Sequence, residues 1–233
     1  EGLYGSTLAC WSFIEQFDGV DAKVQVFNPD LEQHGWHSNH TVIQLMMKDC
    51  PFIVDSVRMS LNRLGVGIRV VQNVVLYTER DDGTLVNTSG QEGKGEAESL
   101  IYLEVDRHTE ADLLKRMREE LIITLCAVDV SVRDFHAMKE RISLAAKELG
   151  TAGYEKEQTF VDWLLDDHFT FLASDEVSYK GGKATPDKAS ALGQLSVRGL
   201  LNLDEHEVSN EPLTYSRHGE RSRVHRPAYL DMI

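Results

Sequence analysis

The stretch Thr41-Val-Ile-Gln-Leu-Met-Met-Lys-Asp-Cys-Pro-Phe-Ile-Val-Asp-Ser-Val57 contains the first strand and the first helix of the predicted fold. Residues 41–47 are mostly apolar, which is typical of a strand buried in a sheet. Asp49 or Cys50 can cap the following helix, and Pro51 suits its first turn, where its missing N–H would be unpaired anyway. The helix then carries a single apolar stripe at spacings of 4, 4 and 3 residues: Ile53, Val57, Leu61 and Leu64.

The chain after this stretch completes an α+β pattern. Gly65 and Gly67 end the first helix, and a long Val-rich strand follows. The resulting βαββαβ order is the ferredoxin-like plan, a fold that serves many unrelated functions. The predicted strands and helices are, in order, residues 41–47, 53–64, 68–77, 99–105, 109–125 and 127–133.

Three segments flank this ferredoxin-like domain, which we place at residues 40–133. The clearest amphipathic helix of the chain is predicted just after it, and Gly150 is a natural end for that helix. We expect an N-terminal helix and strand at residues 1–39, a helical connector at 134–167, and part of a second α+β domain at 168–233.

The strand at residues 68–77 has apolar side chains on both of its faces. The two helices of the domain can cover only one face of the sheet, and an exposed apolar sheet face usually marks a contact surface. We therefore expect the second face to be covered by residues 4–27 and the helix at 135–149, or by another chain.

The composition is that of a globular protein with an acidic excess. Of the 233 residues 42% are hydrophobic, and the net charge of −14 opposes broad contact with nucleic-acid phosphates. No apolar run approaches the roughly 20 residues of a membrane span, and the first residues lack the Met and the basic region of a signal peptide. The 3 cysteines, without a C-x-x-C spacing, favour a reducing compartment. We expect a cytoplasmic piece of a longer protein that binds neither nucleic acid nor membranes.

Two groups of polar residues could carry chemistry. His34, His37 and His40 recur every three residues, which could suit a metal ion, but Gly35 makes the regular helix that this needs doubtful. Residues 166–168, Asp-Asp-His, place carboxylates beside an imidazole, although capping of a helix end is the commoner reason for such a run. The sequence has no G-x-G-x-x-G, G-x-x-x-x-G-K-[ST] or G-x-S-x-G motif. We therefore predict no catalytic residue, no metal site and no cofactor in this chain.

A basic cluster lies near the end of the chain. It could bind an anion, or it could meet acidic surface elsewhere in the molecule, and we favour the second explanation. Its members are Arg217, Arg221, Arg223 and Arg226.

The run Lys48-Asp-Cys-Pro51 after a strand, followed by a helix and by Leu64-Gly-Val-Gly-Ile68, resembles an ACT domain. ACT domains are small βαββαβ modules that commonly sense amino acids, and their members usually have Gly where Phe52 stands here. The resemblance implies an effector site in which backbone N–H groups at the helix start meet a carboxylate. The residues expected to line it are Asp49, Cys50, Pro51, Phe52, Gly65, Val66 and Gly67.

A second resemblance is more specific. Five runs in one order resemble the N-terminal region of the large NAD-specific bacterial glutamate dehydrogenases: residues 40–43, 49–57, 98–102, 167–172 and 224–231. Those enzymes oxidise glutamate to 2-oxoglutarate and ammonia with NAD, and their catalytic and dinucleotide-binding segments lie far downstream. The resemblance therefore implies a parent enzyme that uses NAD, and a region of it that carries neither catalytic residues nor NAD.

Several roles remain open for such a region. It is either a sensor of an amino-acid effector or an assembly module, in which residues 68–77 and their sheet join another copy or another domain. A purely structural oligomerisation module, an independent amino-acid-sensing ACT protein and an independent enzyme are the alternatives. Phe52 in place of Gly favours assembly. The expected partners are an amino acid, the downstream catalytic domains of the same chain and further copies in a homo-oligomer.

Overall fold

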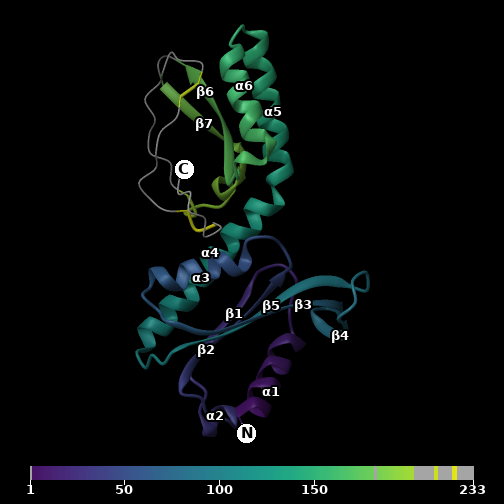
Figure 1. The fold of residues 1–233 in the computed structure, drawn as a ribbon, viewed down its shortest axis with the longest axis vertical. Coiled ribbons are helices and arrows are strands. Elements are labelled where there is room, and N and C mark those ends of the chain that lie inside the picture. Colours follow the sequence, from purple (N-terminus) through teal and green to yellow (C-terminus); the bar gives the residue numbers. More distant parts are fainter. Residues whose placement is uncertain (1, 181–182, 202–212, 215–221, 225–233) are drawn as a thin grey trace. The chain divides into compact units, whose positions relative to one another are not determined.

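The computed structural model describes residues 2–180, 183–201, 213–214 and 222–224 (Figure 1). The chain forms two compact units, each described by itself below. The first unit contains the described residues up to Cys126 together with Arg223 and Val224, and the second contains those from Ala127 to Ser222. Of the predicted basic cluster only Arg223 is described, and Arg217, Arg221 and Arg226 lie outside the described residues.

The first unit is built on a five-stranded antiparallel sheet with the order β1-β2-β5-β3-β4. Helices α3 and α4 lie on one face of this sheet and α1 on the other (Figure 1). The elements are α1 (Gly2–Glu15), β1 (Lys23–Phe27), α2 (Leu31–His34), β2 (His40–Lys48), α3 (Ile53–Arg63), β3 (Ile68–Asp81), β4 (Thr84–Ser89), β5 (Glu96–Asp106) and α4 (Ala111–Arg133), whose residues from Ala127 onward belong to the second unit.

Burial confirms the two helices that the sequence predicted within the domain. The apolar stripe of α3 is buried, as are the side chains of Met117, Leu121 and Leu125 on α4. The hydroxyls of Ser60 on α3 and Thr124 on α4 form a buried hydrogen bond of 3.0 Å that joins the two helices. The α+β class with an antiparallel sheet is confirmed, and the arrangement is consistent with a ferredoxin-like fold.

The prediction of a fourth strand at residues 127–133 is wrong. Residues 127–133 are the last turns of α4, a continuous helix of 23 residues. The alternation of Val128 and Val130 with polar residues suggested a strand, but the buried stripe of α4 continues at helical spacing through Val128 and Ser131. The place beside β2 is taken by β1, with Lys23 opposite Met46 and Phe27 opposite Val42. The sheet is thus completed by a strand from the N-terminal side of the domain.

The second sheet face is partly covered by α1, as expected for residues 4–27. Phe13, Ile14 and Phe17 form a buried cluster with Met46 and Leu100 of the sheet. The helix at 135–149 was also expected to cover this face of the sheet. That expectation is wrong, because this helix belongs to the second unit. There it is α5, which contacts α6 and β7, and its residues Met138 and Ala146 are buried.

The second unit combines helices with a two-stranded antiparallel sheet. The helix predicted up to Asp167 ends in a π-helical turn, within which Asp167 has a positive φ of 56°. Within the described ranges, none of the helices has the length and apolar character that crossing a membrane requires. The elements are α5 (Phe135–Thr151), α6 (Glu155–Trp163), η1 (Leu164–His168), β6 (Ala173–Lys180), β7 (Lys183–Gly193) and η2 (Gln194–Ser196).

Candidate functional site

The loop between β2 and α3 forms a small pocket at the start of α3. The pocket has a volume of about 130 Å³ and includes three of the predicted effector residues, Asp49, Cys50 and Phe52. Pro51 lies between them in the same loop. The other lining residues are Ile53, Val54, Asp55, Asn73 and Ser99.

The polar groups of this pocket suit a zwitterion. Helix α3 begins without a side-chain cap, so N–H groups of its first turn are available for an anionic group. Asp49 and Asp55 both line the pocket, and a carboxylate suits an ammonium group. Burial raises the pKa of the Asp49 carboxyl, which a cationic partner would counteract. Ser99 donates a hydrogen bond of 3.0 Å to the side-chain oxygen of Asn73, and both residues line the pocket.

Phe52 adopts the left-handed backbone conformation that glycine adopts most easily. Its φ is 75° and its ψ is −5°, and it immediately precedes α3. A bulky residue in this region is unusual because its Cβ crowds the backbone, at a cost of about 1–2 kcal/mol. This conformation explains why glycine is the usual residue at this position in ACT domains. Phe52 also lines the pocket.

Gly65, Val66 and Gly67 do not join this pocket. They follow the opposite end of α3, whose 11 residues span about 16 Å. Gly65 follows the end of α3, as predicted, and has a positive φ of 72°, a backbone conformation that glycine adopts without strain. Gly67 packs so closely against Asp106 that a Cβ would collide with the carboxylate, and its carbonyl accepts a hydrogen bond of 2.9 Å from the Asp106 N–H. These residues therefore fix the turn into β3.

A larger cavity, which the sequence analysis did not predict, lies beneath α1. Its volume is about 1020 Å³, and it is bordered by α1, β1 and the segment from Leu31 to His37. The available signal was the polar pair Gln25 and Gln44, which lie opposite each other on a sheet face that is otherwise rich in apolar residues. Register cannot be read from one sequence, so this pairing became visible only in the structure.

His34, His40 and Asp167, which the sequence singled out, have structural partners. His34 stacks on Phe27 with a centroid separation of 4.9 Å, and His40 lies 3.1 Å from Glu104. Asp167 pairs with Lys139 at 2.8 Å. In the part of the chain that is described, no three His, Cys, Asp or Glu side chains gather in a way that could hold a metal ion.

Comparison with known proteins agrees with this architecture. The family model described as "Glutamate dehydrogenase, ACT1 domain" matches residues 1–121. The NAD-specific glutamate dehydrogenase of Pseudomonas aeruginosa is 39% identical over 256 residues, covering 99% of this chain and 16% of that protein. The one from Halomonas elongata is 36% identical over 264 residues, covering 100% of this chain and again 16% of the relative. The chain thus spans about a sixth of the length of these relatives, and it belongs to the glutamate dehydrogenase ACT1-domain family.

Proposed function

We propose that this chain is a non-catalytic regulatory or assembly region of an NAD-dependent glutamate dehydrogenase. The observation that carries the proposal is the similarity to such enzymes along 99% of the chain, although the chain equals only 16% of their length. The parent enzyme would convert L-glutamate, NAD and water to 2-oxoglutarate, ammonia and NADH in the cytoplasm. The downstream domains of the same protein would bind NAD and carry out this reaction.

The 233-residue chain alone is expected to show no saturable binding of NADH, because its sequence contains no dinucleotide-binding motif. The measurement is a fluorescence titration with NADH, together with an assay of glutamate oxidation. A parent enzyme that contains the downstream domains is the positive control. Saturable NADH binding by the isolated chain would show that the non-catalytic assignment is wrong.

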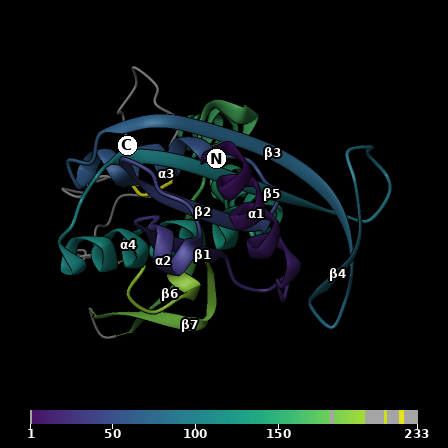
Figure 2. The same cartoon turned by 90° about the horizontal axis from the view of Figure 1, so that it is seen from below.

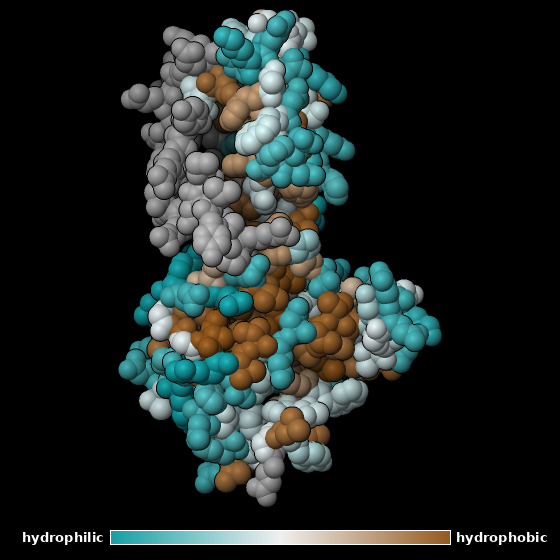
Figure 3. Space-filling model, viewed as in Figure 1, coloured by the Kyte–Doolittle hydropathy of each residue, from teal (hydrophilic) through white to brown (hydrophobic). Residues whose placement is uncertain are grey.

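Assembly through β3 is the role that the geometry supports best. Residues 68–76 of β3 pair with β5 on one side, whereas β4 pairs only with Tyr77–Asp81 at the far end (Figure 2). Among the described residues, no strand pairs with the outer edge of residues 68–76. The side chains of Val71 and Val74 are 37% and 46% exposed there. Hydrophobic side chains also gather between α3 and β3 on the surface of this unit (Figure 3). A long unpaired edge with exposed valines favours pairing with a strand of a second copy.

Replacing Val71 and Val74 together by lysine is expected to convert an oligomer of this chain into a monomer. Lysines on an edge strand oppose pairing because two copies would bring like charges together. Multi-angle light scattering measures the mass of the particle. The control is Val86→Lys on β4, since Val86 is 66% exposed and lies away from this edge. The wild-type chain must form the oligomer in the first place. If it is still monomeric at 100 times the concentration used for the variants, assembly through β3 is contradicted.

Sensing of an amino acid is a second candidate function, favoured by the pocket at the start of α3. Calorimetric titration of the chain with the common amino acids tests it. The site assignment requires that Asp49→Asn weaken any binding that is found, because this change removes the carboxylate that faces the ammonium group. Binding that is unchanged in this variant would place the effector elsewhere.

A further inference from the structure

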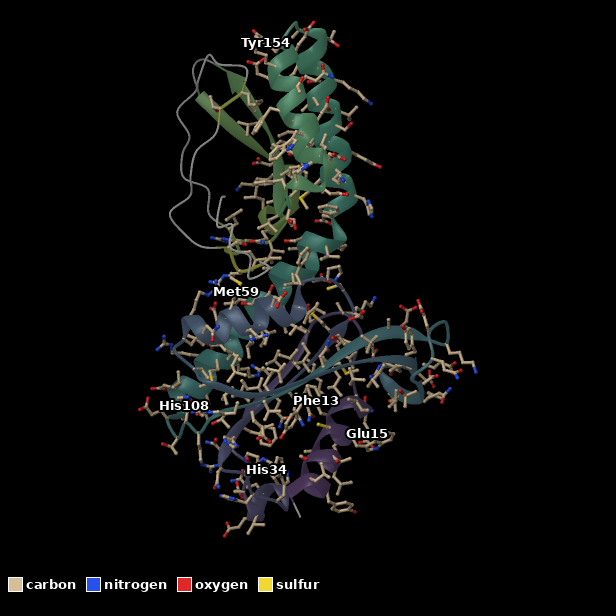
Figure 4. The ribbon with its side chains drawn as sticks, in the orientation of Figure 1. Phe13, Glu15, His34, Met59, His108 and Tyr154 are labelled. Carbon is tan, nitrogen blue, oxygen red and sulfur yellow. The ribbon has the colours of Figure 1, made fainter. Side chains whose placement is uncertain are left out.

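The second unit carries three stacked aromatic rings at the end of α6 and in the π-helical turn η1, here called the ring row: Phe160, Trp163 and His168. Tyr154, labelled in Figure 4, precedes α6, and the ring row lies toward the other end of this helix. The ring centroids of Phe160 and Trp163 are 6.2 Å apart, and those of Trp163 and His168 are 4.6 Å apart. Both pairs are 21° from parallel, and Trp163 takes part in both stacks.

The ring row lies on the outer side of α6. Val161 is the buried residue of this helix, with 6% of its surface exposed. By contrast, Phe160 and Trp163 are 45% and 50% exposed, and the side chain of His168 is 43% exposed. Tryptophan is highly buried in most proteins, and exposed tryptophan side chains are characteristic of binding surfaces. The ring row is therefore a candidate contact surface.

The π-helical turn holds His168 against Trp163. Asp167 has the left-handed angles φ 56° and ψ 18°, and its carboxylate forms an ion pair of 2.8 Å with Lys139 of α5. Nδ1 of His168 lies 3.0 Å from the carbonyl oxygen of Trp163. Because a carbonyl can only accept a hydrogen bond, Nδ1 carries the proton of the neutral imidazole, and Nε2 has the lone pair. The imidazole therefore offers an acceptor to a ligand.

The surroundings of the ring row are acidic. Residues 154–168 contain five carboxylates and one lysine. The Asp166 side chain is 86% exposed and lies 3.9 Å from the His168 ring, and Asp162 is exposed on α6. Aromatic rings have negative faces, so rings, carboxylates and the imidazole lone pair all favour a positively charged ligand.

Arginine is the protein cation that suits such a surface best. Its guanidinium is planar and weakly hydrated, so it stacks on aromatic rings. Its N–H groups can donate to a carboxylate while the plane of the group stays on a ring. The ammonium of lysine is a compact and strongly hydrated charge, and it cannot stack in this way.

We propose that the ring row is a docking surface for a partner polypeptide that presents arginine side chains. The guanidinium groups stack on the exposed ring surface and donate hydrogen bonds to the Asp166 carboxylate. The ligand class follows from the stacked exposed rings together with the acidic surroundings. The surface belongs to the second unit, and the proposal is independent of assembly through β3 and of the pocket at the start of α3.

The first test is calorimetric titration of the 233-residue chain with acetylated tripeptide amides of arginine, lysine and citrulline. Citrulline keeps the shape of arginine without its charge. A salt concentration of about 0.15 M screens charges beyond about 8 Å and so limits general attraction to an acidic protein. We expect saturable binding of the arginine peptide, at least fivefold weaker binding of the lysine peptide and at least tenfold weaker binding of the citrulline peptide. Equal binding of the arginine and lysine peptides, or no binding of the arginine peptide at millimolar concentration, would overturn the proposal.

The second test locates the surface with a matched pair of aromatic changes. Trp163→Leu removes the shared ring of both stacks and should weaken binding of the arginine peptide at least fivefold. Tyr154→Leu is the control, because Tyr154 is 44% exposed but precedes the same helix by about 14 Å along its axis. Full-strength binding by folded Trp163→Leu, or equal weakening by both changes, would overturn the assignment to the ring row.

A matched pair of charge changes decides the location if Trp163→Leu does not fold. Asp166→Asn should weaken binding of the arginine peptide about threefold or more. Glu148→Gln removes the same charge from an exposed position on α5, about 14 Å along the helix from Lys139, and should leave binding unchanged. Equal effects of the two changes would contradict the proposed surface.

Light scattering tests the choice of partner. We expect Trp163→Leu to leave the mass of the chain unchanged in the absence of peptide. Self-association of the wild-type chain that Trp163→Leu abolishes would overturn this choice, because a second copy would then occupy the ring row. Free arginine that binds as tightly as the arginine peptide would likewise overturn docking of a polypeptide.

Discussion

Replacing Arg80 by methionine is expected to destabilise the first unit by about 3–5 kcal/mol. Arg80 of β3 binds Glu98 of β5 through two hydrogen bonds of 2.8 Å, and the two side chains are 11% and 4% exposed. The same guanidinium donates to the carbonyls of Ile14 and Gly83, both at 3.0 Å. Methionine can fill part of the space, but it leaves the Glu98 carboxylate buried without its cation, which is the main cost.

Urea unfolding followed by circular dichroism measures this loss. Arg69→Met is the matched control, because Arg69 also pairs with a carboxylate, Asp106, at 2.6 Å, but with side chains that are 60% and 42% exposed. An ion pair this exposed contributes little to stability, because water and salt screen its charges. Adding Glu98→Leu to Arg80→Met should recover much of the lost stability, because no buried charge then remains. A loss for Arg80→Met no larger than that for Arg69→Met would contradict the buried-pair explanation.

The turn that contains Arg80 shows what local sequence can and cannot predict. The run Arg80-Asp-Asp-Gly83 contains Asp-Gly, a common signal of a tight turn, and Asp82 and Gly83 have the positive φ values, 46° and 78°, that such a turn needs. Turn formation depends on neighbouring residues, so the sequence contains the signal. The partner of the Arg80 side chain is 18 residues away on another strand, and only the register of the sheet brings it close.

The two candidate sites differ in the same way. The pocket at the start of α3 is formed largely by consecutive residues, Asp49 to Asp55, and the sequence located it through the loop between a strand and a helix. The cavity beneath α1 takes residues from α1, β1, α2 and β2, which were assigned to separate segments of the chain. Its polar floor follows from the pairing of β1 with β2, and β1 was not expected in this sheet.

Helix α4 is where local pattern and tertiary packing disagreed. Residues 127–133 are rich in valine, and their alternation with polar residues matched a strand. In the structure they prolong the stripe that begins at Met117, and Ala127, Val128 and Ser131 are buried. The preceding part of α4 already forms hydrogen-bonded helical turns. Extending an existing helix by these residues is therefore easier than starting a new strand. β-Propensity depends strongly on context, and here the packing of the helix decides the conformation.

Replacing Ala127 by proline therefore distinguishes the helix from the predicted strand. Proline in a helix interior removes a backbone hydrogen bond and clashes with the preceding turn, at a cost of about 3 kcal/mol or more. At the first residue of a strand, which the sequence assigned to Ala127, proline would be tolerated. Ala111→Pro is the matched control, because Ala111 is the first residue of α4, where proline fits without losing a hydrogen bond. We expect thermal melting and urea unfolding to show a large loss of stability for Ala127→Pro and little change for Ala111→Pro. Similar stability of the two variants would contradict a continuous α4.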